Sequence, residues 1–263
     1  MTSPPTPFDI AHVGGIPFQV ATLETASEWL LTSAIPRREG LSVRLANAYN
    51  VALASRTHRY MGLLTADGIN FPDGFPVVWF MRLQREGKRT ERVRGPSLFA
   101  LTLEKSVGHN IRHFFLGSTP ETLERLVRTV RSQFPSIEIA GSYSPPFAEV
   151  DDDYIADCAE KVSANEVDVV WVGLGTPKQD VLSSALARQT DLVFINVGAA
   201  FDFMAGVIKE APEWVQRSGF EWAYRFTSEP RRLWRRYFFG NIQFLISATK
   251  HHLILIKSKL FAR

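Results

Sequence analysis

Residues 167–197, VDVVWVGLGTPKQDVLSSALARQTDLVFINV, decide the fold that we predict for this chain. Residues 167–172 have the pattern of a buried strand, and a glycine-rich turn ends it. A helix is predicted over 178–188, and residues 192–197 form a second apolar run. Because strands that are apolar throughout are covered on both faces, this unit predicts a parallel sheet with helices on either side.

The same alternation of strands and helices extends over most of the chain. Further strands are predicted at 41–46, 114–116 and 137–140, and helices at about 22–34, 49–58, 120–134 and 151–163, after a short hairpin at 13–18. The fold class is therefore α/β, a Rossmann-like parallel sheet with helices on both faces. Ligands bind such sheets beyond the carboxyl ends of the strands. Those ends are expected at Asn47, 117–119, 173–179 and 198–200.

The composition is that of an ordinary globular protein, with 45% hydrophobic and 22% charged residues among 263. Cys158 is the single cysteine, which excludes an internal disulfide and is typical of a reducing compartment. Residues 1–15 lack the pattern of a signal peptide, and no apolar run approaches the roughly 20 residues of a membrane-spanning helix. These features predict a cytoplasmic protein.

The C-terminal part of the chain differs from the rest in composition. Residues 230–263 contain eight Lys or Arg and no Asp or Glu, which leaves 22 basic and 27 acidic residues before them. Such a basic end indicates an anionic partner: a membrane surface, a diphosphate or a nucleic acid. Apolar residues mixed with basic and aromatic ones are typical of an interfacial helix, although a core helix pair or an oligomer contact has the same pattern. We therefore divide the chain into an α/β domain over 1–207 and a basic helical appendage over 208–263.

Residues 64–78, LTADGINFPDGFPVV, contain two Asp-Gly steps, at Asp67 and Asp73. Asp-Gly is turn chemistry, because Asp bonds the backbone that follows it and Gly supplies positive φ. A strand is predicted at 77–80, directly after the second step, and a charged, mostly solvated segment at 84–94. A carboxylate on a tight turn beside an apolar strand is where an enzyme places a catalytic acid or base. Simple stabilisation of two turns explains the same pattern.

The sequence GLGTPKQ at 173–179 follows a strand and opens a helix, so its backbone N–H groups can cradle a phosphate. Gly173, Gly175 and Lys178 are then expected to contact the substrate. The loop lacks the third glycine of a dinucleotide fingerprint and the GK[ST] of a P-loop, which disfavours a nicotinamide oxidoreductase. A plain strand–helix turn is the alternative.

Two clusters of charged residues have both a functional and a structural interpretation. The acidic triplet at 151–153 resembles the metal-binding motif of many sugar transferases, but carboxylates at the first turn of a helix favour the macrodipole, and we predict no metal site. Arg225, Arg232 and Arg235 have spacings of seven and three residues, which puts them on one helical face. Guanidinium groups that converge on one ligand form a diphosphate clamp. A solvated basic face is the alternative.

Taken in order, the motifs of this chain resemble those of the WecG/TagA/CpsF family of bacterial glycosyltransferases, which make cell-surface polymers. The matching segments are GI at 15–16, AD at 66–67, PDGFPVV at 72–78, RVRG at 92–95, FLG at 115–117, VGLGTPKQ at 172–179, VGAAFD at 197–202, APEW at 211–214, EWAYR at 221–225 and EPRR at 229–232. No single motif is decisive, but the ordered set covers nearly the whole chain and is highly specific.

The resemblance implies an inverting, metal-independent hexosyltransferase that needs no cofactor. Such an enzyme would move a sugar from a nucleotide diphosphate, usually UDP, to a polyprenyl-diphosphate-linked sugar while peripherally bound to the cytoplasmic face of the membrane. By position, Asp73 resembles the family's catalytic base, Asn47 a residue that lines the pocket, and Arg92 and Gln179 active-site contacts. The three arginines of the appendage look like those that close over the nucleotide diphosphate.

Two departures from the family pattern leave the donor sugar open. Leu45 stands where many members have Thr, and Pro76 where Gly or Ser is common, both near the expected sugar pocket. N-acetylmannosamine, its uronic acid and glucose are all compatible with the sequence. The alternative function is a non-catalytic, membrane-associated nucleotide-binding protein, which gives no reason for the Asp-Gly turn. The tail lacks a nucleic-acid motif, and its apolar residues are also compatible with a homo-oligomer.

Overall fold

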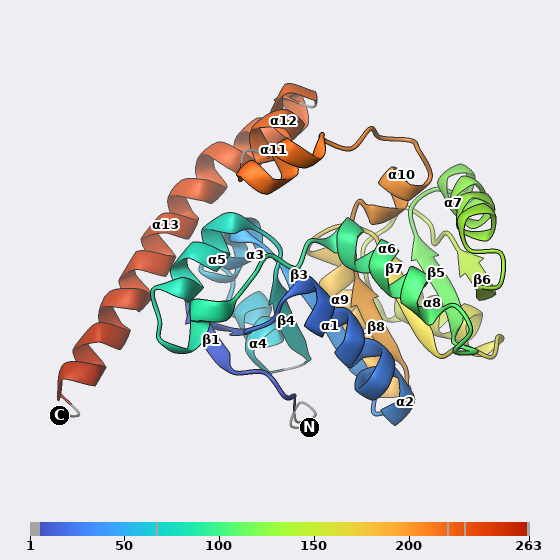
Figure 1. The fold of residues 1–263 in the computed structure, drawn as a ribbon, viewed down its shortest axis with the longest axis horizontal. Coiled ribbons are helices and arrows are strands. Elements are labelled where there is room, and N and C mark those ends of the chain that lie inside the picture. Colours follow the sequence, from blue (N-terminus) through green and yellow to red (C-terminus); the bar gives the residue numbers. More distant parts are fainter. Residues whose placement is uncertain (1–5, 67, 220, 229, 262–263) are drawn as a thin grey trace.

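A parallel sheet of six strands, in the order β4-β3-β8-β7-β5-β6, lies at the centre of the fold (Figure 1). The structure is a computed structural model that describes residues 6–66, 68–219, 221–228 and 230–261, with the backbone alone for residues 217, 225, 228, 230–239 and 259–261. The sheet consists of β3 (Leu41–Ala46), β4 (Ile69–Pro72), β5 (Arg112–Gly117), β6 (Glu138–Tyr143), β7 (Val169–Gly173) and β8 (Val193–Asn196). The predicted hairpin is confirmed as β1 (Ile10–Val13) and β2 (Ile16–Gln19).

Helices cover both faces of the sheet, which confirms the predicted fold class. On one face lie α1 (Leu23–Trp29), α6 (Gly95–Ser106), α7 (Pro120–Gln133) and α10 (Ala200–Met204); on the other lie α8 (Asp152–Ser163) and α9 (Lys178–Gln189). Trp171 of β7 packs in the first core, with its ring centroid 4.9 Å from that of Phe99. Its neighbour Val170 packs in the second core with Leu182 of α9. The strand is apolar throughout because each face supplies its own core.

A third buried cluster lies beside the β3–β4 edge of the sheet. It joins the hairpin to α3 (Ala48–Ala54), α4 (His58–Ala66), α5 (Phe75–Arg82) and the C-terminal helix α13 (Pro230–Phe261). The four helices contribute to this cluster, in order, Val51, Tyr60, Val77 and Phe244. The end of the sheet that carries Asp73 is therefore supported by both the N-terminal and the C-terminal parts of the chain.

The strand predicted at 77–80 is wrong, because those residues belong to α5. Pro76 lies in the first turn of this helix, where its missing N–H costs nothing. Val77 and Met81 are buried while Trp79 between them is exposed, which is a helical period rather than strand alternation. The strand lies earlier, as β4, so Asp73 follows its carboxyl end.

Other differences from the predicted elements are smaller. The helix predicted at 22–34 is divided into α1, a π-helical segment η1 (Leu30–Ala34) and α2 (Ile35–Arg37). The helix predicted at 49–58 is shorter in the structure, where α3 ends at Ala54. The structure also contains helices that were not predicted, including α4 and α6. The charged segment at 84–94 contains a short 3-10 helix, η2 (Glu86–Arg89), and its end is not solvated, since Arg94 is only 5% exposed.

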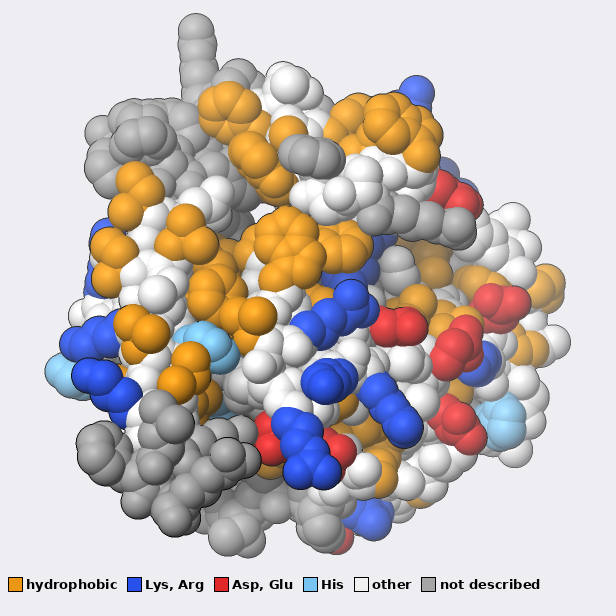
Figure 2. Space-filling model, turned by 60° about the vertical axis from the view of Figure 1, so that its left-hand side comes forward, with side chains coloured by type: hydrophobic (Ala, Val, Ile, Leu, Met, Phe, Trp, Pro, Cys, Tyr) orange, Lys and Arg blue, Asp and Glu red, His pale blue; other side chains and the backbone are white. Residues whose placement is uncertain are grey.

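The C-terminal helices are α11 (Glu213–Ser218), α12 (Glu221–Ser228) and α13, which runs along the outside of the β1–α3 side (Figure 1). Phe244 and Ala248 of α13 are buried, and the Phe244 ring packs edge-on against Phe80 at 5.5 Å. One face of α13 is therefore a core face, while Leu245 and Ile254 on other faces are exposed. Figure 2 shows hydrophobic side chains spread over this side of the molecule. Within the described ranges, none of the helices combines the length and apolarity needed to cross a bilayer.

His113 in β5 is a buried, neutral histidine with both ring nitrogens bonded. Nδ1 accepts a hydrogen bond from Trp171 Nε1 at 3.0 Å, and Nε2 lies 2.9 Å from the Ser106 hydroxyl. Since Nδ1 is an acceptor, Nε2 carries the proton and donates it to Ser106, whose hydroxyl in turn donates to the Leu103 carbonyl. Burial lowers the pKa of His113 to about 4.

This histidine predicts a loss of stability in mild acid. The unfolded chain takes up the proton near pH ~6.5, whereas the folded chain does so only near pH 4. The contribution of His113 is therefore complete above about pH 6.5 and falls by ~1.4 kcal/mol per pH unit towards pH 4. His113→Gln should flatten that slope in urea unfolding measured at several pH values. Parallel curves for the two proteins would contradict the assignment.

Candidate active site

Asp73 and Asn47 lie next to each other at the carboxyl ends of β4 and β3. These strands pair in parallel with Ala46 opposite Pro72, and the Asp73 N–H donates to the Ala46 carbonyl at 2.9 Å. Asn47 caps α3, because its side chain accepts a hydrogen bond from the Tyr49 N–H at 2.9 Å. A Cβ atom placed on Gly74 would lie 3.5 Å from Asn47 Cβ, so the Asp-Gly turn is in contact with the cap.

Arg92 approaches the same edge from the segment that precedes α6. The Val93 N–H donates to the Pro72 carbonyl at 2.9 Å, which holds this segment beside the end of β4. Arg92 Nη2 lies 3.7 Å from Asp73 Oδ1, and the guanidinium carbon lies 5.5 Å from the Phe75 ring centroid. The structure thus brings together three of the predicted site residues: Asn47, Asp73 and Arg92. Asp67, from the first Asp-Gly step, lies outside the described residues.

The 173–179 loop is closed by its own side chain. Gln179 is buried, and its Oε1 accepts a hydrogen bond from the Gly175 N–H at 3.0 Å. Gly175 has φ +77°, and a Cβ there would meet open space, whereas a Cβ on Gly173 would lie 2.6 Å from the Phe201 ring. In this conformation the Gly175 N–H is occupied by Gln179 rather than directed at a ligand.

Lys178 lies apart from the Asp73 group. Its Nζ lies 4.4 Å from the ring centroid of Tyr154 on α8 and 5.7 Å from that of Phe147. Burial lowers the pKa of the Lys178 ammonium. The structure therefore directs this side chain towards α8, as a cation–π contact between two helices. The acidic triplet beside Tyr154 acts as a helix cap, because Asp151 accepts the Tyr154 N–H at 2.9 Å.

A buried polar network that sequence analysis missed joins the Asn47 end of the sheet to the 173–179 loop. Asp180, fully buried at the start of α9, accepts hydrogen bonds from Tyr60 Oη at 2.6 Å and Asn196 Nδ2 at 2.9 Å. Asn50 Nδ2 lies 3.4 Å from both Asp180 and Thr176, and Asn50 Oδ1 accepts the Asn47 N–H at 3.0 Å. Burial raises the pKa of the Asp180 carboxyl. The network fixes the relative position of two loops at the sheet edge.

Sequence signals for this network did exist. Arg44 in β3 and Asn196 in β8 each interrupt an apolar strand, and a polar residue inside a buried strand needs a partner. Arg44 Nη2 donates to Ser184 Oγ of α9 at 2.7 Å, and Asn196 donates to Ser183 Oγ at 2.9 Å. Both strands are thereby tied to the helix that follows the 173–179 loop.

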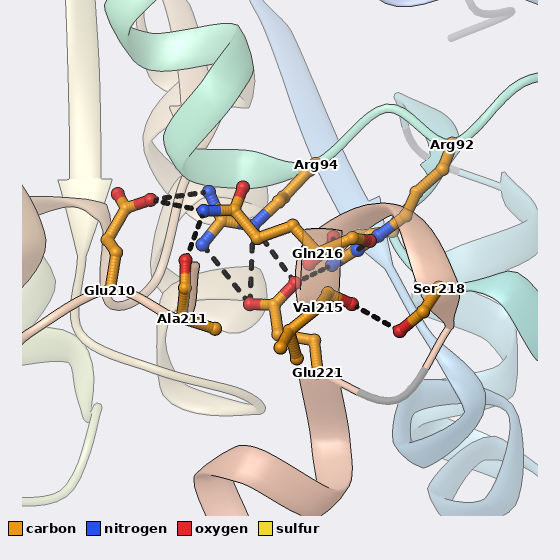
Figure 3. A network of polar contacts seen from close by, with 9 residues as sticks. Arg92, Arg94, Glu210, Ala211, Val215, Gln216, Ser218 and Glu221 are labelled. Carbon is orange, nitrogen blue, oxygen red and sulfur yellow. Dashed lines mark hydrogen bonds and ion pairs between the residues drawn. The ribbon is translucent and has the colours of Figure 1, made fainter. Parts of the chain in front are cut away.

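Glu221, the first residue of α12, connects the appendage to the site (Figure 3). Arg92 Nη2 donates to Glu221 Oε2 at 2.7 Å, and Arg94 Nε and Nη2 donate to the two oxygens of the same carboxylate at 3.1 Å. Glu210 accepts a further hydrogen bond from Arg94 at 3.3 Å. The EWAYR motif contained Glu221, but its spacing gave no sign of a partner.

The side chains of Arg225, Arg232 and Arg235 lie outside the described part of the chain, although their backbone belongs to α12 and α13.

A cavity of about 650 Å³ lies beside α10. Its lining includes Phe203 and Glu210 but not Asp73.

A parallel α/β sheet that gathers a carboxylate, an amide and a guanidinium at its carboxyl edge has the architecture of an α/β enzyme. The chain belongs to the WecG/TagA/CpsF family of glycosyl transferases, whose family model matches residues 11–258. Among curated relatives, an N-acetylglucosaminyldiphosphoundecaprenol N-acetyl-beta-D-mannosaminyltransferase of Bacillus spizizenii (strain ATCC 23059 / NRRL B-14472 / W23) is 31% identical over 211 residues, which are 79% of this chain and 78% of the relative. An enzyme of the same name from Bacillus subtilis (strain 168) is 27% identical over 251 residues, 94% of this chain and 91% of the relative.

These matches confirm the resemblance found in the sequence motifs. The protein is a glycosyltransferase of the hexosyltransferase class. The alternative of a non-catalytic nucleotide-binding protein is therefore set aside.

Proposed function

We propose that this glycosyltransferase moves a sugar from a UDP-sugar to a polyprenyl-diphosphate-linked sugar, with inversion and without a metal ion. The observation that carries the proposal is the position of Asp73, a carboxylate at the carboxyl end of β4 with Arg92 3.7 Å away. The relatives are named for transfer to N-acetylglucosaminyldiphosphoundecaprenol, which supports an acceptor of this kind.

A single-displacement transfer needs a base that accepts the proton of the attacking hydroxyl as the new C–O bond forms. Asp73 is suited to this role because its backbone is fixed by the hydrogen bond to Ala46, while its side chain remains 23% exposed. Displacement by one hydroxyl from the opposite side of the anomeric carbon inverts its configuration. Asn47, in contact with the same turn, is proposed to line the sugar pocket.

The departing UDP gains negative charge, which cationic side chains can stabilise in place of a metal. The proposed cations are Arg92 of the α/β domain and Arg225, Arg232 and Arg235 of the appendage. The 173–179 loop is proposed to bind the nucleotide part of the donor through Gly173, Gly175, Lys178 and Gln179. Because the Gly175 N–H is bonded to Gln179, phosphate binding there requires this hydrogen bond to change.

N-acetylmannosamine is the first donor sugar to test, since both relatives are named as its transferases. Leu45, which departs from the family pattern, is buried in β3 and packs towards Gly95. UDP release should be measured with UDP-N-acetylmannosamine, its uronic acid and UDP-glucose, with and without a prenyl-diphosphate-N-acetylglucosamine acceptor. Release that depends on the acceptor and survives EDTA supports the proposal. Loss of release in EDTA, restored by a divalent cation, would refute metal independence.

We also propose that the enzyme binds peripherally to the inner face of the cell membrane, where such an acceptor is presented. Exposed apolar residues lie on α5, at its C-cap and on the C-terminal helices: Trp79, Leu83, Trp214, Trp222, Leu245, Ile246, Leu253 and Ile254. Exposed basic residues lie beside those of α5, namely Arg82, Arg85, Lys88 and Arg89. Aromatic and aliphatic residues flanked by cations are typical of an interfacial surface.

The α5 part of this surface gives a test on the α/β domain itself. Trp79→Ser with Leu83→Ser should weaken binding to anionic phosphatidylglycerol vesicles by at least about tenfold, because both large apolar side chains lose their burial in the bilayer. Vesicle co-sedimentation measures the effect. Phe147→Ser is the matched control, since Phe147 is also exposed but follows β6, the edge strand opposite β4. Equal binding by both variants would contradict the proposal that this surface binds the membrane.

A further inference from the structure

The guanidinium group of Arg92 lies between two carboxylates. Nη2 is 2.7 Å from Glu221 Oε2 and 3.7 Å from Asp73 Oδ1. The shorter distance is a charge-assisted hydrogen bond, and the longer one is beyond hydrogen-bond range. Arg92 is therefore held by the appendage carboxylate, and its ion pair with the carboxylate of the proposed base is the longer one and lacks a hydrogen bond.

The other contacts of Arg92 do not hold it as firmly. Nη1 donates to the Gln216 carbonyl at 3.2 Å, and the Phe75 ring lies 5.5 Å from the guanidinium carbon. Nε is buried and has no hydrogen-bond partner among the described residues. Glu221 supplies the only charge-assisted hydrogen bond that the described residues make to this guanidinium.

Glu221 itself is not able to follow Arg92. Arg94 Nε lies 3.1–3.2 Å from both of its oxygens, and Arg94 Nη2 donates to Oε1 at 3.1 Å (Figure 3). Arg94 is fixed in turn, because it is buried at the start of α6 and its side chain is 6% exposed. A rigid carboxylate thus determines where the Arg92 guanidinium lies.

We infer that Glu221 is a positioning residue that keeps Arg92 from closing on Asp73. This inference rests on the proposed function, in which Asp73 accepts the proton of the acceptor hydroxyl. If Glu221 lost its charge, Arg92 would move closer to Asp73 and form a hydrogen-bonded ion pair, and a carboxylate with a closer cation is a weaker base. The charged groups near Asp73 include Arg92, then Glu221 and Arg94 behind it, with Glu210 against Arg94.

A double-mutant cycle tests whether Glu221 acts through Arg92. In the full-length protein, Glu221→Gln should lower kcat/KM on the order of tenfold, while KM for the UDP-sugar changes little. In an Arg92→Gln background, the same Glu221→Gln change should cost less than about twofold, because the group it restrains is gone. Single-turnover measurements with excess enzyme keep the slow variants measurable.

The control is Glu210→Gln, which removes another acidic partner of Arg94 without touching Arg92, and it should stay within about twofold of the wild-type rate. Thermal unfolding verifies that each variant is folded. If Glu221→Gln does not fold, Glu221→Asp replaces it, since Asp keeps the charge but shortens the reach. Equal losses of kcat/KM in both backgrounds would mean that Glu221 merely anchors α12. That result would overturn this inference but not the proposed function. A wild-type protein that is inactive with every donor would overturn the proposed function as well.

Discussion

Asp73→Asn is expected to lower kcat by about 100- to 10,000-fold and to leave the fold intact. The amide of Asn has almost the shape of the carboxylate but does not accept a proton, so the acceptor hydroxyl would have to lose its proton without help. The hydrogen bond from the residue 73 N–H to Ala46 is made by the backbone and survives the change. Initial rates of UDP release with the lipid-linked acceptor give the measurement.

The control for this variant is Asp153→Asn, a change of the same chemistry at an exposed position in the first turn of α8. Its rate should match that of the wild type. Binding of the UDP-sugar to the Asp73 variant should persist, because a base acts on the acceptor hydroxyl and not on the nucleotide. A wild-type rate in Asp73→Asn would remove this residue from the proposed mechanism.

Asp180→Ala should lower the free energy of unfolding by about 3–5 kcal/mol, the largest effect on stability that we expect from a single change. The substitution leaves Tyr60 Oη and Asn196 Nδ2 without the carboxylate to which both donate inside the core. Buried donors that lose their acceptor cost their full desolvation free energy. Urea unfolding monitored by circular dichroism measures the loss.

The matched control is Asp191→Ala. Asp191 pairs with Arg38 at 3.4 Å, but its side chain is 61% exposed, and surface pairs of this kind contribute less than about 1 kcal/mol. If Asp180→Ala and Asp191→Ala change the free energy of unfolding equally, the buried network does not stabilise the site in the way that its geometry indicates.

The sequence was most informative where each residue had one interpretation. In β7, α9 and β8, two continuously apolar runs, with a glycine-rich turn and a helix between them, predict a strand–helix–strand unit, and the structure has it. Residues 75–82 were misassigned because a short apolar run of Val, Trp and Phe suits a strand or a buried helix equally well. Tertiary packing decided between the two, by burying Val77 and Met81 and exposing Trp79.

For the candidate site, the sequence could identify chemistry but not contacts. Asp73 was recognised from its turn and Asn47 from its place at a strand end. Arg92 and Glu221 are 129 residues apart, and no local pattern reveals that their side chains meet. Asp180 is similar, since an acid in the first turn of a helix has an ordinary reason to be there. Its burial depends on partners from three other elements.

The most direct test of the account is the structure of the product formed from UDP-N-acetylmannosamine and prenyl-diphosphate-N-acetylglucosamine. Nuclear magnetic resonance of the purified lipid would give the configuration at the new anomeric carbon. Asp73 acting as a base in a single displacement predicts a disaccharide with the configuration opposite to that of the donor, formed in EDTA and absent with Asp73→Asn. A product that retains the donor configuration would contradict that mechanism.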